Sequence, residues 1–268
     1  MKDKEIAHYS NEYLWKRLSL SETNRERIQK TVEMIPKEVN SIADIGCGSG
    51  LFLNYIKENR GIPHLIGIDF SEDSMKMLKV DKKVGDITNI PLQEHSYDLV
   101  SALEVLEHLD LEEYSKAKEE LARVSKRYIF VSVPFAETLE DEFVKCPECK
   151  TYFNKSHHKR SFDEQTVKTL FESQGYRSKE IKYISKRNVY FILTPIFKWY
   201  KKVRGKLLTE GTVCPVCGYE VKNKTKKGEI SVKKDRSSVV YNMFSFLKKI
   251  WPKKHTYKWI AALYEKTD

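Results

Sequence analysis

Asp44-Ile45-Gly46-Cys47-Gly48-Ser49-Gly50 is the stretch of this sequence that decides the fold. Apolar residues precede it, as in a buried strand, and apolar residues recur after it at helical spacing as far as Ile56. Three glycines at every second position let the backbone turn sharply and approach a ligand closely, although glycine turns also occur as plain structure. The spacing differs from the G-x-G-x-x-G of dinucleotide sites, and no Lys-Ser/Thr pair follows as in a P-loop.

An acidic residue, Asp69, ends the next apolar run, residues 64–69, which begins shortly after the predicted helix. In a doubly wound sheet this position lies beside the glycine turn, where a carboxylate can accept both hydroxyls of a ribose. Ser71 then predicts the N-cap of a helix that carries Met75 and Leu78.

Two further acids stand at the same kind of position. Asp86 follows a short third strand, and Glu104 follows the apolar run 97–103. For any one of these carboxylates, a plain surface position is an adequate alternative. Four acids in register after four strands, Asp44 and Asp69 included, favour a single binding site at the carboxyl edge of a parallel sheet.

These motifs resemble the class I S-adenosylmethionine (SAM) dependent methyltransferases over roughly residues 41–134. The glycine stretch resembles motif I of that family, and Glu104-Val105-Leu106-Glu107-His108 resembles its E-V-L-E-H segment, which lies under the methionine end of the cofactor. The resemblance implies an α/β fold: a doubly wound, Rossmann-like, seven-stranded sheet whose last strand is antiparallel and inserts next to the fifth.

The resemblance also implies SAM as the cofactor. It places Asp69 on the ribose hydroxyls, Asp86 on the adenine amino group and Ile87 against the adenine ring. The cofactor-binding residues that it indicates are Asp44, Gly46, Cys47, Gly48, Gly50, Asp69, Phe70, Asp86, Ile87 and Glu104.

Length and composition limit the architecture. A chain of 268 residues with 40% hydrophobic content can hold one large α/β domain, or a domain with an insertion. No run of about 18 apolar residues occurs, and the first residues lack the apolar stretch of a signal peptide. We expect a cytoplasmic location, or one at the inner face of the membrane.

The net charge of +10 is unevenly distributed. Residues 186–268 contain 20 Lys/Arg and 6 Asp/Glu, a net charge of +14, so the rest of the chain is acidic. This asymmetry indicates an acidic partner for the last third: phospholipid headgroups, nucleic acid or a phosphorylated substrate. A solvated basic face is the alternative.

The chain divides into four predicted parts. Residues 1–40 form a helical cap in which Tyr9, Tyr13 and Trp15 touch the ligands or pack on the core. Residues 41–185 form the core. Residues 186–255 are a basic, aromatic insertion, and 256–268 supply the last core strand. Within the core, the pattern predicts a helix over 111–124, a strand over 127–134, a helix that Asp163 caps and Gly175 ends, and a strand over 176–184.

Four of the five cysteines form two C-P-x-C pairs, at 146–149 and 214–217. Each such turn supplies two thiolates, and two of them complete a tetrahedral zinc site. Disulfides are the competing interpretation, which the cytosolic context and the two prolines disfavour. We predict a structural zinc bound by Cys146, Cys149, Cys214 and Cys217, with no open position for catalysis. Cys47 lies in the glycine turn, where a small residue is needed.

Histidines follow the first pair. In residues 156–163, His158 and Phe162 resemble an H-x-x-x-F/Y-S/T stretch of small-molecule methyltransferases, with Asp163 in place of the hydroxyl residue. That segment crosses the carboxyl edge of the sheet, so His158 or His157 could remove a proton from the acceptor. Either could instead cap a helix, join a metal site or orient the loop. His108 is the second candidate base, although it often has a structural role in the family.

Two segments, 189–204 and 239–251, are apolar and aromatic with flanking lysines. Helices of this kind lie in the interface of a bilayer, which would bring the protein to a membrane as a peripheral partner. Packing on each other or over the sheet is the alternative.

The favoured function is methyl transfer from SAM to an O or N atom of a small-molecule, glycan or lipid-linked acceptor. An RNA methyltransferase that holds RNA through the zinc module and the basic tail is the alternative. This chain lacks the N-P-P-Y-type ending found in exocyclic-amine methyltransferases, and it lacks a Pro-Cys nucleophile. Nucleic acid is therefore the less favoured partner. A non-catalytic SAM-binding or zinc-scaffold protein, and a nicotinamide oxidoreductase, fit the motifs less well.

Overall fold

A computed structural model describes residues 21–189, 212–220 and 254–267 of the chain. Its main feature is a seven-stranded sheet in the order β3-β2-β1-β4-β5-β9-β8. Strands β1 to β5 are parallel, and β9 lies antiparallel between β5 and β8. The prediction of a doubly wound sheet with an antiparallel last strand beside the fifth is confirmed. The strands are β1 (Ser41–Ile45), β2 (His64–Asp69), β3 (Asp81–Val84), β4 (Tyr97–Leu103), β5 (Ser125–Pro134), β8 (Tyr176–Val189) and β9 (Lys254–Lys266).

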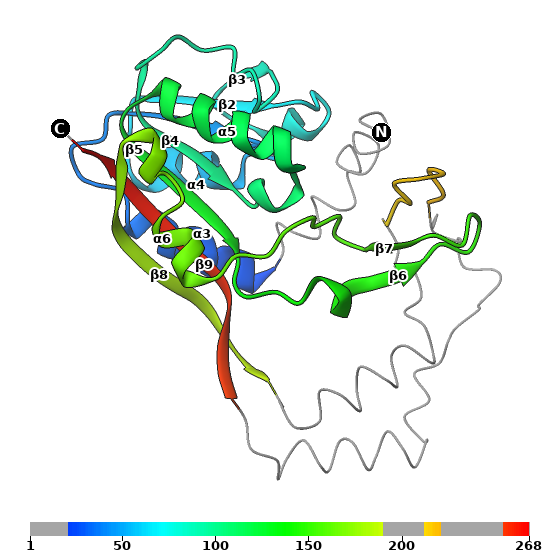
Figure 1. Ribbon diagram of the computed structural model, residues 1–268. Coiled ribbons are helices and arrows are strands. Elements are labelled where there is room, and N and C mark those ends of the chain that lie inside the picture. Colours follow the sequence, from blue (N-terminus) through cyan, green and yellow to red (C-terminus); the bar gives the residue numbers. More distant parts are fainter. Residues whose placement is uncertain (1–20, 190–211, 221–253, 268) are drawn as a thin grey trace.

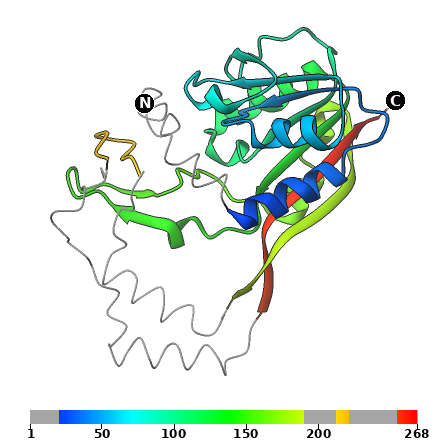
Figure 2. The same cartoon turned by 180° about the vertical axis from the view of Figure 1, so that it is seen from behind.

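Helices cover both faces of this sheet, as the two opposite views show (Figures 1 and 2). On one face lie α3 (Glu22–Glu33) and α4 (Leu51–Asn59), and on the other lie α5 (Leu111–Val124) and α6 (Glu164–Lys168). Successive side chains of a strand point to opposite faces. Along β5, Tyr128 and Phe130 therefore join the core under α3 and α4, whereas Ile129 and Val131 join the core under α5 and α6. Each such buried side chain contributes about 1.5–3 kcal/mol.

Helix α5 begins and ends where the sequence predicts. Asp110 caps it, because its Oδ1 accepts from the Glu113 backbone N–H at 2.9 Å while the Glu113 carboxylate accepts from the Asp110 N–H at 2.9 Å. Asp163 caps α6 through the Thr166 N–H at 2.7 Å, without a reciprocal bond. The helix predicted as far as Gly175 is interrupted: α6 ends at Lys168, a 3₁₀ turn covers residues 172–174, and Gly175 takes the left-handed conformation (φ 79°) that ends the segment.

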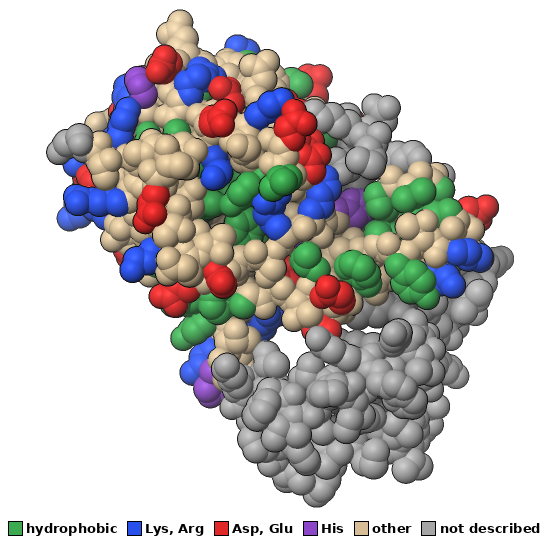
Figure 3. Space-filling view, in the orientation of Figure 1, with side chains coloured by type: hydrophobic (Ala, Val, Ile, Leu, Met, Phe, Trp, Pro, Cys, Tyr) green, Lys and Arg blue, Asp and Glu red, His purple; other side chains and the backbone are tan. Residues whose placement is uncertain are grey.

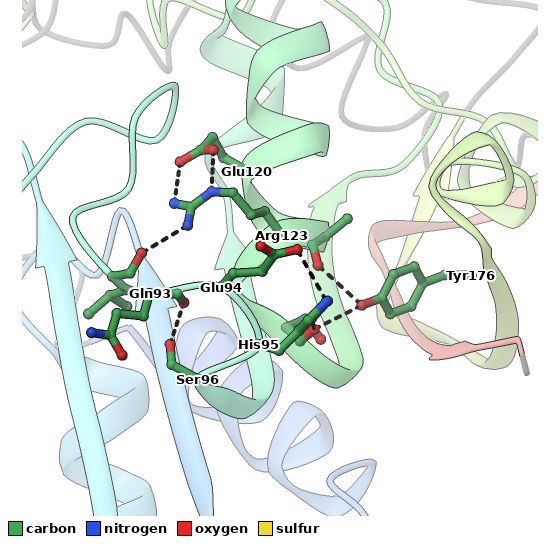
Figure 4. A network of polar contacts seen from close by, with 10 residues as sticks. Gln93, Glu94, His95, Ser96, Glu120, Arg123 and Tyr176 are labelled. Carbon is green, nitrogen blue, oxygen red and sulfur yellow. Dashed lines mark hydrogen bonds and ion pairs between the residues drawn. The ribbon is translucent and has the colours of Figure 1, made fainter.

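A polar network around Arg123 closes the sheet edge at which β4 and β5 begin (Figure 4). The guanidinium donates to the Glu120 carboxylate at 2.6 and 2.7 Å and to the carbonyls of Ile90 and Leu92 at 2.9 and 3.0 Å. These bonds tie the end of α5 to the loop before β4. They lie opposite the carboxyl edge, where the predicted site residues are.

The helix predicted after Ser71 is shorter than expected. Only η1 (Ser74–Met77), a 3₁₀ turn, forms there, with Leu78 extended at its end. The chain must reach β3 by residue 81, and Met75 and Leu78 are already buried within this short connection. The remaining 3₁₀ turns are η2 (Leu106–His108), η3 (Leu139–Glu142) and η4 (Glu172–Gln174).

A two-stranded hairpin projects from the core after η3 (Figures 1 and 2). It consists of β6 (Phe143–Lys145) and β7 (Tyr152–Asn154), which pair antiparallel and flank the first C-P-x-C turn. Residues 212–220, with the second turn, lie beside it. We call these two segments together, residues 143–157 and 212–220, the knuckle module.

Several predictions fall outside the described residues. Tyr9, Tyr13 and Trp15 lie there, as does most of the predicted basic insertion, apart from its two ends and residues 212–220. The membrane-contact prediction for 189–204 and 239–251 therefore stays a prediction. Within the described ranges, every helix is too short or too polar to cross a bilayer.

Candidate functional site

The glycine turn lies at the carboxyl end of β1 and needs its glycines. Gly46, Gly48 and Gly50 all have positive φ (72°, 52° and 77°), a region that side chains with a Cβ rarely adopt. The N–H groups of Gly46 and Cys47 both donate to the carbonyl of Ile68, at 2.7 and 3.0 Å. The turn is thereby fixed against the end of β2.

We expect Gly46→Ala to destabilise the protein more than Gly61→Ala. Both glycines have positive φ (72° and 62°), so each alanine costs about 1 kcal/mol in backbone strain. A Cβ at Gly46 would also lie 2.5 Å from Val105 Cγ2, whereas one at Gly61 meets no atom within 4 Å. This crowding adds about 1–3 kcal/mol, to be measured by urea denaturation without ligand. Equal losses in the two variants would contradict the close packing of the turn.

Asp69 lies beside this turn, as predicted. Its Oδ2 accepts from the Gly48 N–H at 2.8 Å and its Oδ1 from the Ser71 N–H at 2.9 Å. Burial raises the pKa of this carboxyl group. Because a carboxylate has about four acceptor positions, Asp69 can still accept from ligand hydroxyl groups.

Asp44 is fully enclosed at the end of β1. Its Oδ1 accepts from the Ser101 hydroxyl of β4 at 2.7 Å. Burial raises the pKa of Asp44 to about 7, against the opposing effects of the Ser101 hydrogen bond and of Arg27. Two buried acids with raised pKa values at one sheet edge mark a candidate functional site.

The remaining predicted cofactor residues stand along the same edge. Asp86 follows β3, and its Oδ1 accepts from the backbone N–H and the hydroxyl of Thr88 at 2.9 and 2.7 Å. Ile87 is buried, whereas the Phe70 ring is about two-fifths exposed. Burial raises the pKa of the Cys47 thiol, which agrees with the expectation that this residue only fills the turn.

Glu104 follows β4 in the left-handed region (φ 59°), which is uncommon for a non-glycine residue and often marks a functional site. Its Oε1 accepts from the Ser132 hydroxyl at 2.9 Å, and its Oε2 accepts from the Trp259 indole N–H at 2.5 Å. Arg27 of α3 lies 3.7 Å from Oε1, with its guanidinium over the Trp259 ring. No local sequence signal marks Arg27 or Trp259 as site residues.

The three predicted catalytic histidines separate into two places. The rings of His108 and His158 lie edge to face with centroids 4.9 Å apart, and His158 Nδ1 is 2.5 Å from the Glu137 carboxylate. His157 turns away into the knuckle module, where its Nε2 lies 2.8 Å from the carbonyl of Val213. The structure thus brings His108 and His158 together and leaves His157 apart.

Glu107, which the sequence analysis gave no role, lies beside these two rings. Its Oε1 is 4.0 Å from His108 Nε2. The side chain is completely buried, and neither carboxylate oxygen has a hydrogen-bond partner among the described residues. Burial and the nearby Glu104 charge raise the pKa of Glu107 well above its ordinary value.

The four paired cysteines meet at the tip of the knuckle module. Their sulfur atoms all lie within 4.8 Å of one another, and the Sγ–Sγ distances Cys146–Cys217 and Cys149–Cys214 are both 3.6 Å. These distances exceed a disulfide bond of about 2.05 Å and approach the edge of about 3.8 Å expected for a ZnS₄ tetrahedron with 2.3 Å bonds.

The two C-P-x-C turns have the same local geometry. In each, the residue after the second cysteine has positive φ, Lys150 at 62° and Gly218 at 76°. Its N–H donates to the carbonyl of the first cysteine, at 3.1 and 2.9 Å. Hydrogen bonds from Thr151 lower the pKa of the Cys149 thiol to about 6, which favours a thiolate.

The knuckle module has a small apolar core of its own. Val144 and Phe153 of the hairpin pack with the buried sulfurs of Cys146 and Cys214. Large apolar side chains also remain on its surface (Figure 3); those exposed by about two-fifths or more are Phe143, Tyr152 and Val216. A core this small needs additional support.

Comparisons with known proteins agree with this geometry. A family model described as a methyltransferase domain matches residues 43–128, from the glycine turn into β5. An uncharacterized protein of Methanocaldococcus jannaschii is 29% identical over 171 residues, which is 62% of this chain and 70% of that protein.

Solved structures show the same fold. A SAM-dependent methyltransferase from Archaeoglobus fulgidus is similar with a TM-score of 0.54 and 21% identity, covering 90% of this chain and 91% of that one. One from Mesorhizobium loti has a TM-score of 0.51 and 11% identity, covering 89% and 96%.

Proposed function

Because this chain belongs to the class I SAM-dependent methyltransferases, we propose that it transfers a methyl group from SAM to an O or N atom of a small-molecule, glycan or lipid-linked acceptor. The observation that carries the proposal is the convergence of the strand ends. Asp44 and Asp69 lie at the carboxyl ends of β1 and β2, and Asp86 and Glu104 come just after β3 and β4. These four strands are parallel neighbours, so the four acids share one edge of the sheet with the glycine turn.

The residues at this edge fit the cofactor. Asp44, Asp69 and Glu104 provide carboxylates for a ligand that carries a sulfonium and an ammonium group, and Arg27 is the cation nearest to Glu104. The left-handed glycines let the backbone pass close to the ligand. In the proposed arrangement Asp69 accepts from the ribose hydroxyls and Asp86 from the adenine amino group.

Beyond binding the cofactor, methyl transfer requires few further groups from the protein. SAM supplies an activated methyl group, and the chain must align the acceptor for an in-line displacement and exclude water. We propose that the acceptor lies beside His108, four residues after Glu104, and His158, whose ring contacts that of His108. With Nδ1–H of His158 donated to Glu137, its Nε2 carries the lone pair that can receive a proton or hold a cation.

The second part of the proposal is a structural zinc in the knuckle module. Four thiolates at tetrahedral separation suit Zn²⁺ and leave no open position, so the ion stabilises the module and takes no part in methyl transfer. Support comes from the Sγ–Sγ distances and from the two matching turns.

Isothermal titration calorimetry tests the cofactor site. We expect Asp69→Ala to weaken SAM binding by about tenfold or more, because two ribose hydroxyls lose a charged acceptor. Asp81→Ala, at the exposed start of β3, is the matched control and should bind normally. Wild type should bind a 2′-deoxy analogue of S-adenosylhomocysteine more weakly than the parent compound. Asp69→Ala, without the acceptor, should bind the two compounds with nearly equal affinity. If Asp69→Ala keeps full affinity, Asp69 is not in the site.

Methyl-labelled SAM tests the acceptor class. Label should enter the small-molecule, glycan or lipid fraction of a cell extract. Label in RNA would favour the alternative function, and failure to bind SAM near saturation would contradict both. Liposome flotation separately tests membrane contact through 189–204 and 239–251.

A further inference from the structure

Three metal-ligating side chains meet next to the proposed methyl-transfer site. One ligand atom from each of Glu107, His108 and His158 lies within 4.8 Å of the others. Glu107 and His108 belong to η2, directly after β4, and His158 comes from the segment between β7 and α6, about fifty residues later. The cluster is separate from the four cysteines.

Glu107 is the member of this cluster whose environment most favours a bound cation. Glu107 is fully buried, and neither of its oxygens has a hydrogen-bond partner in the part of the chain that the structure describes. A buried carboxyl group in this state is costly, whether it is charged or neutral. The charges of Glu104 and Glu137 repel its carboxylate form, and that of Arg27 attracts it. With three carboxyl groups around one guanidinium, the cluster favours a bound cation.

Glu137 supports the same interpretation from the other side of His158. It lies 2.5 Å from His158 Nδ1 and is therefore placed to accept a proton from that nitrogen. A metal-ligating histidine almost always donates its second ring N–H to a carboxylate, a carbonyl or water, which fixes the tautomer and the ring orientation. His158 therefore has the partner that a ligand histidine requires.

The ligand set indicates the kind of ion. Two imidazoles and one carboxylate suit the divalent first-row metals from Mn²⁺ to Zn²⁺ better than Ca²⁺ or Mg²⁺. Metal–ligand bonds of about 2.0–2.2 Å place two ligand atoms at most about 4.4 Å apart, and the 4.0 Å between Glu107 Oε1 and His108 Nε2 lies within that limit. Three protein ligands leave positions open, as in catalytic metal sites.

We infer that Glu107, His108 and His158 bind a divalent first-row transition-metal cation, whose open positions hold an oxygen of the methyl acceptor beside the cofactor. The inference that a cation binds rests only on the geometry of this cluster. The inference that the cation holds the methyl acceptor also rests on the proposed function. On this inference His108 and His158 are metal ligands, and neither acts as a general base.

Binding of Mn²⁺ to the purified full-length protein, followed by electron paramagnetic resonance of free Mn²⁺, tests the site. A mild chelator first removes weakly held ions and leaves zinc on the four cysteines, which Mn²⁺ does not displace because it prefers oxygen and nitrogen ligands. We expect one Mn²⁺ per chain, displaced by one added equivalent of Zn²⁺.

Variants locate the site. Glu107→Gln, which keeps the side-chain volume, and His158→Asn should each weaken Mn²⁺ binding at least tenfold, and Glu137→Gln about 10- to 100-fold. His95→Ala, at the opposite sheet edge, should bind normally. Unfolding curves show which variants are folded. If Glu107→Gln or His158→Asn does not fold, His108→Gln is used in its place.

The result that overturns the inference is no Mn²⁺, Co²⁺ or additional Zn²⁺ bound at millimolar concentration, or full affinity in Glu107→Gln. SAM binding is measured on the same samples. Loss of the cation with SAM binding intact concerns this inference only, whereas a protein that binds the cation and ignores SAM contradicts the proposed function and leaves the cation site standing.

Discussion

Cys214→Ser is expected to purify without the zinc, about one ion per chain, that the wild-type protein retains after chelator treatment. Removing one of four thiolates opens the tetrahedron, and structural zinc in small modules contributes about 10–16 kcal/mol of apparent binding free energy at neutral pH. The knuckle module depends on it, because Cys146 and Cys214 supply half of the four buried residues of its core. Metal analysis of the purified protein measures the loss.

Cys47→Ser is the matched control, since Cys47 is buried in the glycine turn, away from the other sulfurs, and should keep its zinc. Hydrogen exchange then shows where the loss acts. Protection should fall in residues 143–157 and 212–220 of Cys214→Ser and stay high in the sheet. Wild-type protein that is fully folded and free of metal would refute the four-thiolate site.

The loss should also reach the acceptor side of the site. His157 Nε2 contacts the carbonyl of Val213, the residue before Cys214. His158 directly follows His157 in the chain. A loosened second turn therefore frees the segment that holds His158 against Glu137. Faster exchange at 156–160 in Cys214→Ser would show this coupling.

The sheet could be predicted because its signals are local. The glycine turn, the acid after each strand and the apolar alternation each occupy a few consecutive residues, and parallel strands bring their carboxyl ends to one edge. The meeting of the two C-P-x-C turns could also be predicted, because a tetrahedral metal site requires the four thiolates that two such turns supply. The turns are 64 residues apart, and their sulfur atoms do meet.

The contacts that complete the site could not be predicted, because each joins distant segments. Arg27 of α3 and Trp259 of β9 meet at Glu104, from opposite ends of the chain. Glu137 finds His158 through the path of the hairpin. Glu107 is visible in the sequence, but only the fold shows that it is buried and that its oxygens find no partner among the described residues.

The affinity for SAM is expected to rise with pH up to about 7 and then to level off. In the free protein, burial raises the pKa of Asp44 from 3.8 to about 7, so below pH 7 this carboxyl group is mostly protonated. A bound sulfonium favours the carboxylate and lowers that pKa, so binding releases a proton. If the pKa in the complex falls well below 5, affinity increases about fifty-fold between pH 5 and pH 7.

The stability of the free protein should change in the opposite direction. The unfolded chain loses the Asp44 proton near the ordinary pKa of 3.8, whereas the folded protein holds it up to about 7. Between these values the folded state binds more protons, so this group makes the free energy of unfolding decrease as pH rises. SAM should therefore raise the melting temperature more at pH 7 than at pH 5.

Calorimetry from pH 5 to pH 7 checks the binding profile, in a range where the amino group of SAM stays protonated. S-adenosylhomocysteine lacks the sulfonium charge, so its affinity should depend less on pH. Asp44→Asn cannot release a proton, and its profile for SAM should be flatter, with the residual slope of Asp69, whose pKa burial also raises. A flat profile in the wild type, or a steep one in Asp44→Asn, would show that Asp44 does not face the cationic part of the cofactor.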